Sequence, residues 1–591
     1  MEEYQDYGPT ILTTWNGDSF DLPYLYKRMV NLFGTETANR LSPIGIIDDR
    51  LAGVGKRRDY AIKIAGVSQL DYLLLYKNYT YNEEPRYTLD AISKKELGRG
   101  KVEYEGSLDD LFRDDIDKFI KYNVSDVELL VAMDKKLDFI EIARGICHKG
   151  HVPYEDFSMS SRFLDGAALV YCKKNGLVAS GVQSDERGLA QGAFVKPPQP
   201  GLYEFIFDCD ASSLYPSIIR TLNISPETLF GKIKDWNEDD WVSKKYRDLS
   251  IETYVNNSSE ELFGSNESRF VLNSELLKDY LDQNNLCISS NGCLYKTDKV
   301  GLIPSILTTW FAERKEYRKL AKEKGDAGDK DGYRYYDKKQ LVTKILLNSF
   351  YGVLLLPSFR FYNKNNGEAV TVTGKSVLQY AIKVSNYYYN KRLNTEKDWV
   401  VLADTDSIFL PALPLIRLEY EGNNENILVE KTFEIVNEVQ AIINRSFDMY
   451  AKKFHNIEPH YWEFKQELIT RRAFFGEAKK RYAMWIINKN GLKVDELEVK
   501  GLDMVRSSFP ALFRKFQKEV VEDILHAVSM DDLNKKIRDF KEIYRKEPIA
   551  NIMMPTGVHE LSKYSYGQKG TPVHAKSAQN YNKLLDLFEI N

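Results

Sequence analysis

Residues 207–219 have the sequence FDCDASSLYPSII, and the interpretation of the whole chain starts from this stretch. Its first half is apolar and aromatic with two aspartates, Asp208 and Asp210, which predicts a strand that ends in carboxylates. Small residues follow, and Pro216 suits the first turn of a helix. A carboxylate at a strand end can bind a cation, while the backbone N–H groups of a helix N-terminus face an anion. The stretch therefore predicts a site for a metal ion beside a phosphate.

A second acidic pair lies in ADTDSIF, residues 403–409, within an apolar context. Residues i and i+2 of a strand share a face, so Asp404 and Asp406 are expected to lie on one side. Like charges repel there unless a cation sits between them. Residues 400–410 are apolar, then acidic, then apolar again, which predicts a β-hairpin with charged residues at its turn. A polar turn that uses aspartate only for local hydrogen bonds is the alternative.

The segment KKQLVTKILLNSFYG, residues 338–352, predicts a helix with a nucleotide-binding face. Four of its residues recur at helical spacing and form one polar and aromatic stripe: Gln340, Lys344, Asn348 and Tyr351. Lysine suits phosphates, and tyrosine can stack on a base. A solvated amphipathic helix is the alternative, but the end of the stripe beside Gly352 is apolar and is expected to be buried.

Helical periodicity appears twice in residues 307–350, on either side of the turn-rich loop GDAGDKDG. This pattern predicts a helical hairpin. Arg314 and Arg318 lie four residues apart on its first helix and could complete a phosphate clamp with Lys344. The three segments together predict one chemistry, in which carboxylates hold two Mg²⁺ ions roughly 3.5–4 Å apart and a basic helix holds a triphosphate.

These segments resemble motifs A (DxxSLYPS), B (QxxxKxxxNSxYG) and C (DTDS) of the family B, alpha-like DNA polymerases, and most of all the T-even-type phage replicative enzymes. The resemblance runs from residue 14 to about residue 582, with the motifs in family order. One departure is visible, since Leu402 and Ala403 stand where the family usually has Tyr-Gly before DTDS. The implied fold is α+β and multidomain, with a partial RNase-H-like exonuclease domain followed by a palm, fingers and thumb.

The resemblance implies a role for individual residues. Asp210 and Asp406 would ligate both Mg²⁺ ions, for which Mn²⁺ could substitute, with help from the carbonyl of Ala211, and Asp404 would be a less critical neighbour. Tyr215 would stack under the incoming sugar and exclude a 2′-hydroxyl. The remaining nucleotide contacts would be backbone N–H groups of Ser213 and Leu214, the cations Arg314, Arg318 and Lys344, the amide Asn348 that supports them, and the ring of Tyr351.

Contacts to primer–template DNA are implied at further positions. Residues 191–194 (QGAF), with Gly192, resemble a template-binding turn, and Gly352 would line the nascent base pair. Lys480 and Tyr482 resemble an element that touches the primer strand. Glu467 resembles a nearby acid of the palm, and residues 569–582 resemble a thumb segment that grips duplex DNA.

Near the N-terminus, WNGDSFDLPYL (residues 15–25) and YNVSD (residues 122–126) resemble two motifs of the family's 3′–5′ exonuclease. Asp21 and Asp126 would bind metal, and Tyr122, on the same helix face as Asp126, would orient the attacking water. A pair of helix-surface residues is the alternative for YxxxD alone. The family's first exonuclease motif, an acidic DxE strand, is expected to lie outside this chain, as is the end of the thumb with its sliding-clamp peptide. We therefore expect a poor exonuclease, and either a second polypeptide or a fragment.

Bulk composition excludes several classes. The chain has 591 residues, 43% hydrophobic and 28% charged, and five scattered cysteines without a CxxC pair, so neither a disulfide scaffold nor a zinc site is expected. No long apolar run and no signal peptide are present, which predicts a cytoplasmic protein of a host cell and no membrane. The net charge of −4 does not itself indicate DNA binding, although basic clusters occur at 315–324, 338–344 and 479–481.

The resemblance predicts six segments: a partial exonuclease domain (1–143), a connecting segment (144–185), the palm in two parts (186–305 and 357–503), a helical fingers hairpin (306–356) and a partial thumb (504–591). The predicted function is DNA-templated addition of deoxynucleotides to a primer 3′ end in phage replication. Two rivals stay open: a chain that works mainly as a nuclease subunit, and a catalytically silent DNA-binding scaffold.

Overall fold

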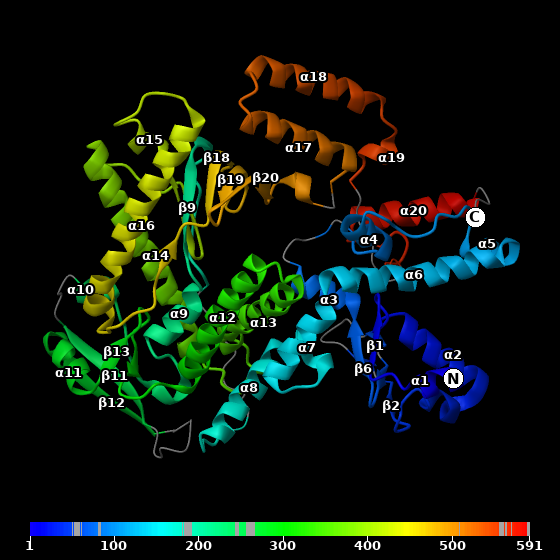
Figure 1. Ribbon diagram of the computed structural model, residues 1–591, viewed down its shortest axis with the longest axis horizontal. Coiled ribbons are helices and arrows are strands. Elements are labelled where there is room, and N and C mark those ends of the chain that lie inside the picture. Colours follow the sequence, from blue (N-terminus) through cyan, green and yellow to red (C-terminus); the bar gives the residue numbers. More distant parts are fainter. Residues whose placement is uncertain are drawn as a thin grey trace. The chain divides into compact units, whose positions relative to one another are not determined.

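The computed structural model describes residues 1–49, 51–52, 59–60, 62–80, 84, 86–179, 181, 192–242, 247–255, 266–506, 509–554, 561, 564–568 and 570–587. The chain forms two compact units. The first consists of residues 1–196 and 207–467, and the second of residues 197–206 and 468–591. One boundary thus falls inside the breaker KPPQPG. Figure 1 shows both units with their elements labelled.

The N-terminal part of the first unit is built on two parallel strands, β1 (Ile11–Thr14) and β6 (Ser68–Asp71), paired from Ile11 opposite Ser68 to Thr14 opposite Asp71. Apolar residues of α2 (Asp21–Asn39) pack with those of residues 62–67 in a small core. Short strand pairs join β2 (Ile47–Asp48) to β5 (Lys63–Ile64) and β3 (Leu51–Ala52) to β4 (Asp59–Tyr60).

Helices follow this small sheet: α3 (Tyr72–Tyr79), α4 (Leu89–Leu97), α5 (Leu108–Asp114), α6 (Ile116–Leu137), α7 (Phe139–Gly150) and α8 (Ser160–Lys174); α1 (Glu2–Tyr7) precedes it. Residues 108–137 are helical, but the helix is not continuous. Asp115 breaks it, because its side chain caps α6 by accepting a hydrogen bond from the Lys118 N–H at 2.9 Å.

The sheet that carries the acidic motifs has the order β9 (Ile206–Ala211), β16 (Ser407–Pro411), β15 (Leu402–Asp404) and β7 (Val195–Lys196) in the first unit. β17 (Phe464–Lys465) pairs antiparallel with β9. The β-hairpin predicted at 400–410 is confirmed as β15 and β16. Helix α14 (Lys364–Leu393) packs against β16, and α16 (Glu425–His455) packs against β17. The shorter α9 (Leu214–Thr221) packs against α14, and α15 (Leu413–Ile416) packs against α14 and α16.

The predicted helical hairpin is confirmed as α12 (Leu302–Asp326) and α13 (Lys330–Leu354), which lie side by side (Figure 1). A separate antiparallel sheet precedes it, in the order β12 (Asn266–Asn273), β11 (Asp248–Val255), β10 (Leu229–Ile233), β14 (Cys293–Lys296), β13 (Leu286–Ile288). Its core includes Ile233, Ile251 and Leu294 of the strands and Leu277 of α11 (Leu277–Gln283). The short helix α10 (Glu238–Val242) lies between β10 and β11 in the sequence.

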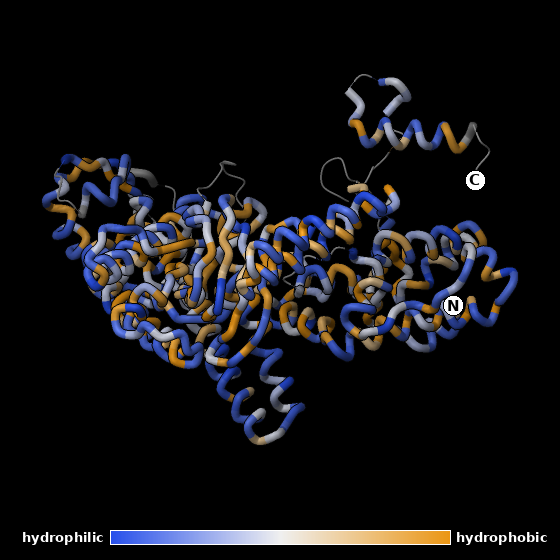
Figure 2. Tube along the Cα trace, turned by 90° about the horizontal axis from the view of Figure 1, so that it is seen from above, coloured by the Kyte–Doolittle hydropathy of each residue, from blue (hydrophilic) through white to orange (hydrophobic). Residues whose placement is uncertain are grey.

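The second unit contains the antiparallel strands β8 (Gly201–Glu204), β18 (Leu468–Phe475), β19 (Tyr482–Lys489) and β20 (Leu492–Lys500). Its core joins Ala483 and Leu502 to Val521 and Leu525 of α17 (Ala511–Leu525). The helices that follow are α18 (Met530–Lys546), α19 (Ile549–Ile552) and α20 (Val573–Leu587). Figure 2 shows apolar positions interspersed with hydrophilic ones along the chain's helices, the pattern of amphipathic elements.

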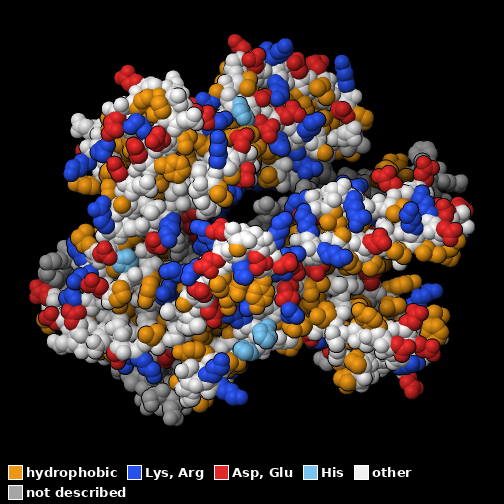
Figure 3. All heavy atoms as spheres, viewed as in Figure 1, with side chains coloured by type: hydrophobic (Ala, Val, Ile, Leu, Met, Phe, Trp, Pro, Cys, Tyr) orange, Lys and Arg blue, Asp and Glu red, His pale blue; other side chains and the backbone are white. Residues whose placement is uncertain are grey.

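No helix within the described ranges is long and apolar enough to cross a membrane. On the face drawn in Figure 3, Lys and Arg side chains are interspersed with Asp and Glu side chains, as the small net charge leads one to expect. The five cysteines are buried free thiols, in agreement with the absence of a disulfide pattern in the sequence.

Candidate active site

Asp210 and Asp406, which lie far apart in the sequence, are brought together by the sheet. Asp210 is near the end of β9, and Asp406 is in the turn between β15 and β16. The backbone N–H of Ala211 donates a hydrogen bond to the carbonyl oxygen of Asp406 at 2.8 Å. This bond fixes the two acidic residues on adjacent backbones, so their carboxylates share one edge of the sheet.

Asp404 and Asp406 do not share a strand face, contrary to the prediction. Asp404 is the last residue of β15 and pairs with Ser407, so Thr405 and Asp406 form a two-residue turn. Such tight hairpin turns require a residue with positive φ, and Thr405 has φ 63°. The Thr405 N–H donates to the carbonyl of Phe194 at 3.0 Å, and its hydroxyl donates to the Asp404 carboxylate at 3.1 Å. A β-branched residue held in this costly conformation indicates a constrained site.

The electrostatics of this edge suit a cation. Burial raises the pKa of Asp210 to about 8, and three nearby carboxylates add to the shift: Asp406, Glu467 and Asp208. The positive charge of Lys344, on α13, opposes this rise, so the lysine lies within electrostatic range of Asp210. Asp208 is itself buried and accepts a hydrogen bond from the Glu467 N–H at 2.9 Å. Repelling carboxylates of this kind are stabilised by a bound cation.

The donor atoms fit a hard divalent metal. Carboxylate oxygens of Asp210 and Asp406, with the nearby carbonyl of Ala211, are the ligand types that Mg²⁺ and Mn²⁺ prefer. In the part of the chain that the structure describes, His, Cys, Asp and Glu side chains form no group of three or more arranged to hold a metal ion. Asp210 and Asp406 would supply two carboxylates to such an ion and leave coordination positions for substrate oxygens.

Helix α9 starts directly beside the acidic edge. Ser213 precedes it with φ 52°, Leu214 is buried, and the N–H of Ser212 donates to the carbonyl of Glu463 at 2.9 Å. The ring centroids of Tyr215 and Tyr351 are 4.3 Å apart. Burial raises the pKa of the Tyr215 phenol, and Tyr351 and Asp406 add to the shift. The pair forms an aromatic wall next to the carboxylates.

Gly374 of α14 also lies against this wall, and it belongs to none of the sequence motifs. A Cβ atom at position 374 would lie 3.0 Å from Cε1 of Tyr215, tighter than an ordinary contact. The absence of a side chain there lets the Tyr215 ring lie flat against the helix. An isolated glycine within a helical pattern could have suggested such a close approach, but not its partner.

The stripe predicted on the second helix of the hairpin lies on α13, and Arg314 and Arg318 lie on α12. Asn348 and Gly352 are exposed, however, and not buried as predicted. The prediction was wrong because the apolar neighbours Leu346, Leu347 and Phe350 are buried on the opposite side of the helix. The side that carries Asn348 and Gly352 therefore stays exposed. An open polar face beside the carboxylates is what a substrate-binding surface requires.

The predicted DNA contacts lie in both units. Gln191 lies outside the described residues, whereas Gly192 is described, and the carbonyl of Phe194 contacts the Thr405 turn. In the second unit, Lys480 has φ 60° in the turn between β18 and β19, and Tyr482 opens β19 opposite Lys500. Within the predicted thumb segment, Lys569 lies outside the described residues and residues 573–582 belong to α20.

A second acidic site lies in the N-terminal part, where Lys101 brings the exonuclease-like residues together. Its ammonium donates to the Tyr122 hydroxyl at 3.1 Å and forms an ion pair with Asp126 at 2.6 Å. The other oxygen of Asp126, Oδ1, is buried and accepts no hydrogen bond from any described residue. Burial raises the pKa of Asp21, and the charge of Lys101 opposes the shift. Sequence reasoning missed Lys101 because no motif contains it.

Two further aspartates flank this site. The buried Asp71 accepts hydrogen bonds from the backbone N–H groups of Asn16 at 3.0 Å and Leu73 at 2.9 Å. Burial, and then the charge of Asp71, raise the pKa of Asp18 to about 6. Asp71 therefore holds the loop that leads to Asp21, while Asp18 adds a carboxyl group to the site.

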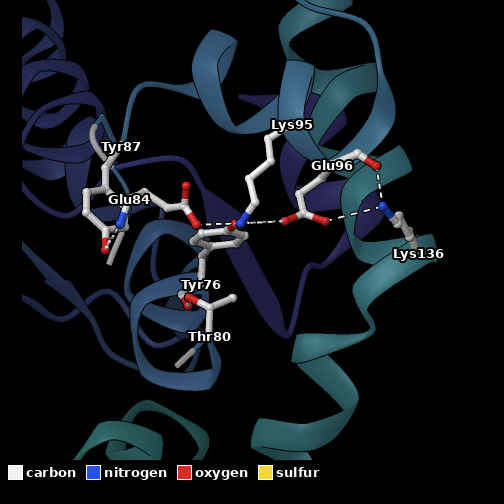
Figure 4. Close-up of polar contacts among 7 residues, drawn as sticks. All are labelled: Tyr76, Thr80, Glu84, Tyr87, Lys95, Glu96 and Lys136. Carbon is white, nitrogen blue, oxygen red and sulfur yellow. Dashed lines mark hydrogen bonds and ion pairs between the residues drawn. The ribbon is translucent and has the colours of Figure 1, made fainter. Parts of the chain in front are cut away.

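A polar network anchors the helix that carries Tyr122 and Asp126 (Figure 4). The Tyr76 hydroxyl of α3 donates to Glu96 at 2.8 Å and accepts from Lys95 at 3.3 Å. Lys136, near the end of α6, forms an ion pair with Glu96 at 3.3 Å. These contacts join α3, α4 and α6. They therefore help to fix the helix whose Tyr122 and Asp126 contact Lys101.

Sheet-borne acids, an aromatic wall and a basic helix facing them define a nucleotidyl-transferring enzyme of the polymerase class. Residues 161–584 match the family model "DNA polymerase family B", and residues 1–92 match the model of that family's exonuclease domain. The chain belongs to DNA polymerase family B and is a DNA-directed DNA polymerase. Enzymes of this family generally use divalent metal ions.

Similar proteins include the DNA-directed DNA polymerase of Escherichia phage RB69, which is 27% identical over 651 aligned positions covering 98% of this chain and 68% of the relative. The corresponding enzyme of Enterobacteria phage T4 is 26% identical, with the same shares covered. DNA polymerase 1 of Pyrococcus abyssi is 25% identical over 557 positions, 92% of this chain and 59% of the relative. The resemblance deduced from motifs A, B and C is confirmed.

Proposed function

We propose that the chain extends a primer 3′ end on a DNA template by two-metal-ion nucleotidyl transfer, in the replication of a phage within the host cytoplasm. The observation that carries the proposal is the 2.8 Å hydrogen bond from the Ala211 N–H to the Asp406 carbonyl, which places the turn of Asp406 against the strand of Asp210, within range for the two charges to interact. Two Mg²⁺ ions held there by Asp210, Asp406 and the Ala211 carbonyl would activate the 3′-hydroxyl and neutralise the leaving pyrophosphate.

The remaining residues of the site would bind and orient the nucleotide. Lys344, Arg314 and Arg318 hold the triphosphate, because cations on two neighbouring helices can reach its oxygens from one side. The N–H groups of Ser213 and Leu214, at the start of α9, add donors. Asn348 supports this cluster, Tyr351 and Gly352 line the base pair, and Asp404 orients the turn through its bond to Thr405.

We propose DNA contacts in each of the two units, and we assign the segments of the chain by the domain order of the family. Gly192 contacts the template, Lys480 and Tyr482 contact the primer strand, and residues 504–591 grip the duplex as a thumb. We assign residues 1–143 to a partial exonuclease domain, 144–185 to a connecting segment, 186–305 and 357–503 to the palm, and 306–356 to the fingers. We propose a sliding clamp as a further partner of this replicative enzyme.

A primer-extension assay tests the proposal against its rivals. The wild-type chain with primer–template DNA, all four dNTPs and Mg²⁺ is expected to lengthen the primer, and EDTA is expected to stop the reaction. Shortening of the primer without extension would favour a nuclease subunit. Binding of DNA with neither reaction would favour a silent scaffold, and either result would refute the proposal.

Tyr215 is proposed to exclude ribonucleotides, because its ring lies next to the carboxylates and packs against both Gly374 and Tyr351. In Tyr215→Ala, the preference for dNTP over rNTP, measured as the ratio of the two kcat/KM values, should fall on the order of 10²-fold. Tyr215→Phe keeps the ring and should keep the preference. An unchanged ratio in the alanine variant would show that another group reads the 2′ position.

The N-terminal site is proposed to support a weak 3′–5′ exonuclease, with Asp21 and Asp126 as metal ligands and Tyr122 orienting water. Lys101 would hold Tyr122 and Asp126 in place, as its bonds to both side chains suggest. In Lys101→Met, excision of an unpaired 3′ nucleotide should slow about tenfold or more, with extension unchanged. Hydrogen exchange at the α6 amides should accelerate in the same variant, because the helix loses its partly buried ion pair.

The exposed Lys94, whose ion pair with Asp90 lies within α4, provides the matched control for this experiment. Lys94→Met is expected to change neither excision nor exchange of the α6 amides. If Lys101→Met behaved like Lys94→Met in both measurements, the positioning role of Lys101 would be ruled out.

A second polypeptide that brings further carboxylates is the partner we propose for this exonuclease. Five β-branched side chains of α6 form an exposed apolar stripe on the side opposite Tyr122: Ile116, Ile120, Val124, Val127 and Val131. Such a stripe is typical of a docking face, and the phage relatives extend well beyond the region matched here. Adding the part of the RB69 relative that lies outside the matched region should raise excision, and Val127→Asp should abolish that increase.

A further inference from the structure

Arg220, in the last turn of α9, lies between two aromatic rings. Its guanidinium carbon is 3.9 Å from the ring centroid of Tyr461 and 4.7 Å from that of Phe311. Its Nε donates a hydrogen bond to the hydroxyl of Thr308 at 3.1 Å. A planar guanidinium can stack on two rings and still donate in its plane, which a lysine ammonium cannot do.

Each element that Arg220 contacts carries a different part of the proposed active site. Helix α9 carries Tyr215 and begins at the acidic edge. Phe311 and Thr308 lie on α12, about one and two turns before Arg314. The third contact, Tyr461, comes shortly before Glu463, whose carbonyl accepts the Ser212 N–H at 2.9 Å.

The segment that contains Tyr461 is in turn fixed to the acidic strand. The Tyr461 N–H donates to the buried Thr221 hydroxyl at 2.9 Å. Beyond it, β17 pairs with β9, with Phe464 opposite Ala211 and Lys465 opposite Asp210. One side chain therefore joins the helix of the sugar-binding tyrosine, the helix of the phosphate-binding arginines, and the strand beside Asp210.

We propose that Arg220 is a positioning residue for nucleotidyl transfer, which sets the placement of α12 relative to α9 and so of the triphosphate cations relative to the aromatic wall. It touches neither substrate nor metal, and the inference rests on the function proposed above. Loss of the stack would leave α12 free to shift, and because Arg314 and Arg318 must meet the triphosphate together, nucleotide binding should suffer more than chemistry.

The test is Arg220→Met, which keeps the side-chain length and removes the charge and the planar fork. The affinity for the next complementary dNTP is measured on a dideoxy-terminated primer–template, so that no chemistry is needed, and KM and kcat are measured in parallel on an extendable primer. The dNTP dissociation constant and KM should rise about tenfold, and kcat should change less than threefold. Arg220→Lys should recover only part of the affinity, because a lysine cannot stack on both rings.

Lys296→Met is the matched control, because Lys296 also lies over an aromatic ring, 6.0 Å from the centroid of Phe230, but on the separate sheet of β14. It should leave the dNTP affinity unchanged. Tyr461→Leu should resemble Arg220→Met, and the double variant should be no worse than either. The inference would be overturned if Arg220→Met bound dNTP as tightly as the wild type, or if the losses of dNTP affinity were additive in the double variant. A wild-type chain that binds dNTP but does not extend primers would count only against the proposed function.

Discussion

Asp406→Asn should abolish primer extension, lowering the rate of single-nucleotide incorporation on the order of 10³-fold or more. Asparagine keeps the size of the side chain, and the backbone bonds of Asp406 to Ala211 and Asp404 do not involve the carboxylate. The substitution therefore removes one negative charge and one strong metal ligand while the turn is retained. Single-turnover incorporation with Mg²⁺ measures the chemical step, and fluorescence anisotropy measures DNA affinity, which should stay within about twofold of the wild type.

Two control variants separate a loss of the metal site from a mere change in charge. Asp404→Asn should lower the rate of single-nucleotide incorporation about tenfold. The Asp404 carboxylate accepts a hydrogen bond from the Thr405 hydroxyl at 3.1 Å, so it supports the turn without being the main metal ligand. Asp279→Asn removes an exposed charge on α11 and should have no effect. If Asp406→Asn still incorporated nucleotides within tenfold of the wild type, the assignment of the metal site would be wrong.

The elements of the site were predictable because each one is encoded locally. The strand before Asp210, the hairpin around Asp406 and the helix of Lys344 depend on periodicity and turn residues within short windows. Their order along the chain then identified the family, and with it the approach of two distant aspartates. The sheet order that produces this approach, β9 next to β16, was not readable from local pattern.

Other features depended on contacts that no local pattern encodes. Asn348 was predicted to be buried but is exposed, because the apolar residues around it lie on the opposite side of the helix. Asp406 lies in the turn and not on a strand face, because Thr405 adopts a positive φ that its β-branched side chain disfavours. Gly374, Lys101 and Arg220 act through partners distant in sequence, so only the assembled chain reveals them.

Lys344→Met should lower kcat/KM for dNTP incorporation on the order of 10²-fold. Lys344 lies on α13, its charge opposes the rise that burial causes in the pKa of Asp210, and Arg314 and Arg318 lie on the neighbouring α12. A charge-assisted hydrogen bond to a phosphate contributes about 1.5–3 kcal/mol, and each 1.4 kcal/mol corresponds to a factor of ten. The loss should appear in kcat as well as KM, because negative charge builds up on the leaving pyrophosphate as the bond breaks.

Two further variants, Lys344→Arg and Lys319→Met, show whether the loss of kcat/KM in Lys344→Met depends on the charge or on the position of the lysine. Arginine restores the charge on a longer and wider head group, so activity within about tenfold of the wild type would show that charge dominates. Lys319 is exposed on α12 and paired only loosely with Glu323 at 3.8 Å, so Lys319→Met should leave kcat/KM unchanged and excludes a general effect of surface charge on DNA binding. Equal losses in Lys344→Met and Lys319→Met would remove Lys344 from the triphosphate site, because a specific contact requires that only the lysine facing Asp210 matters.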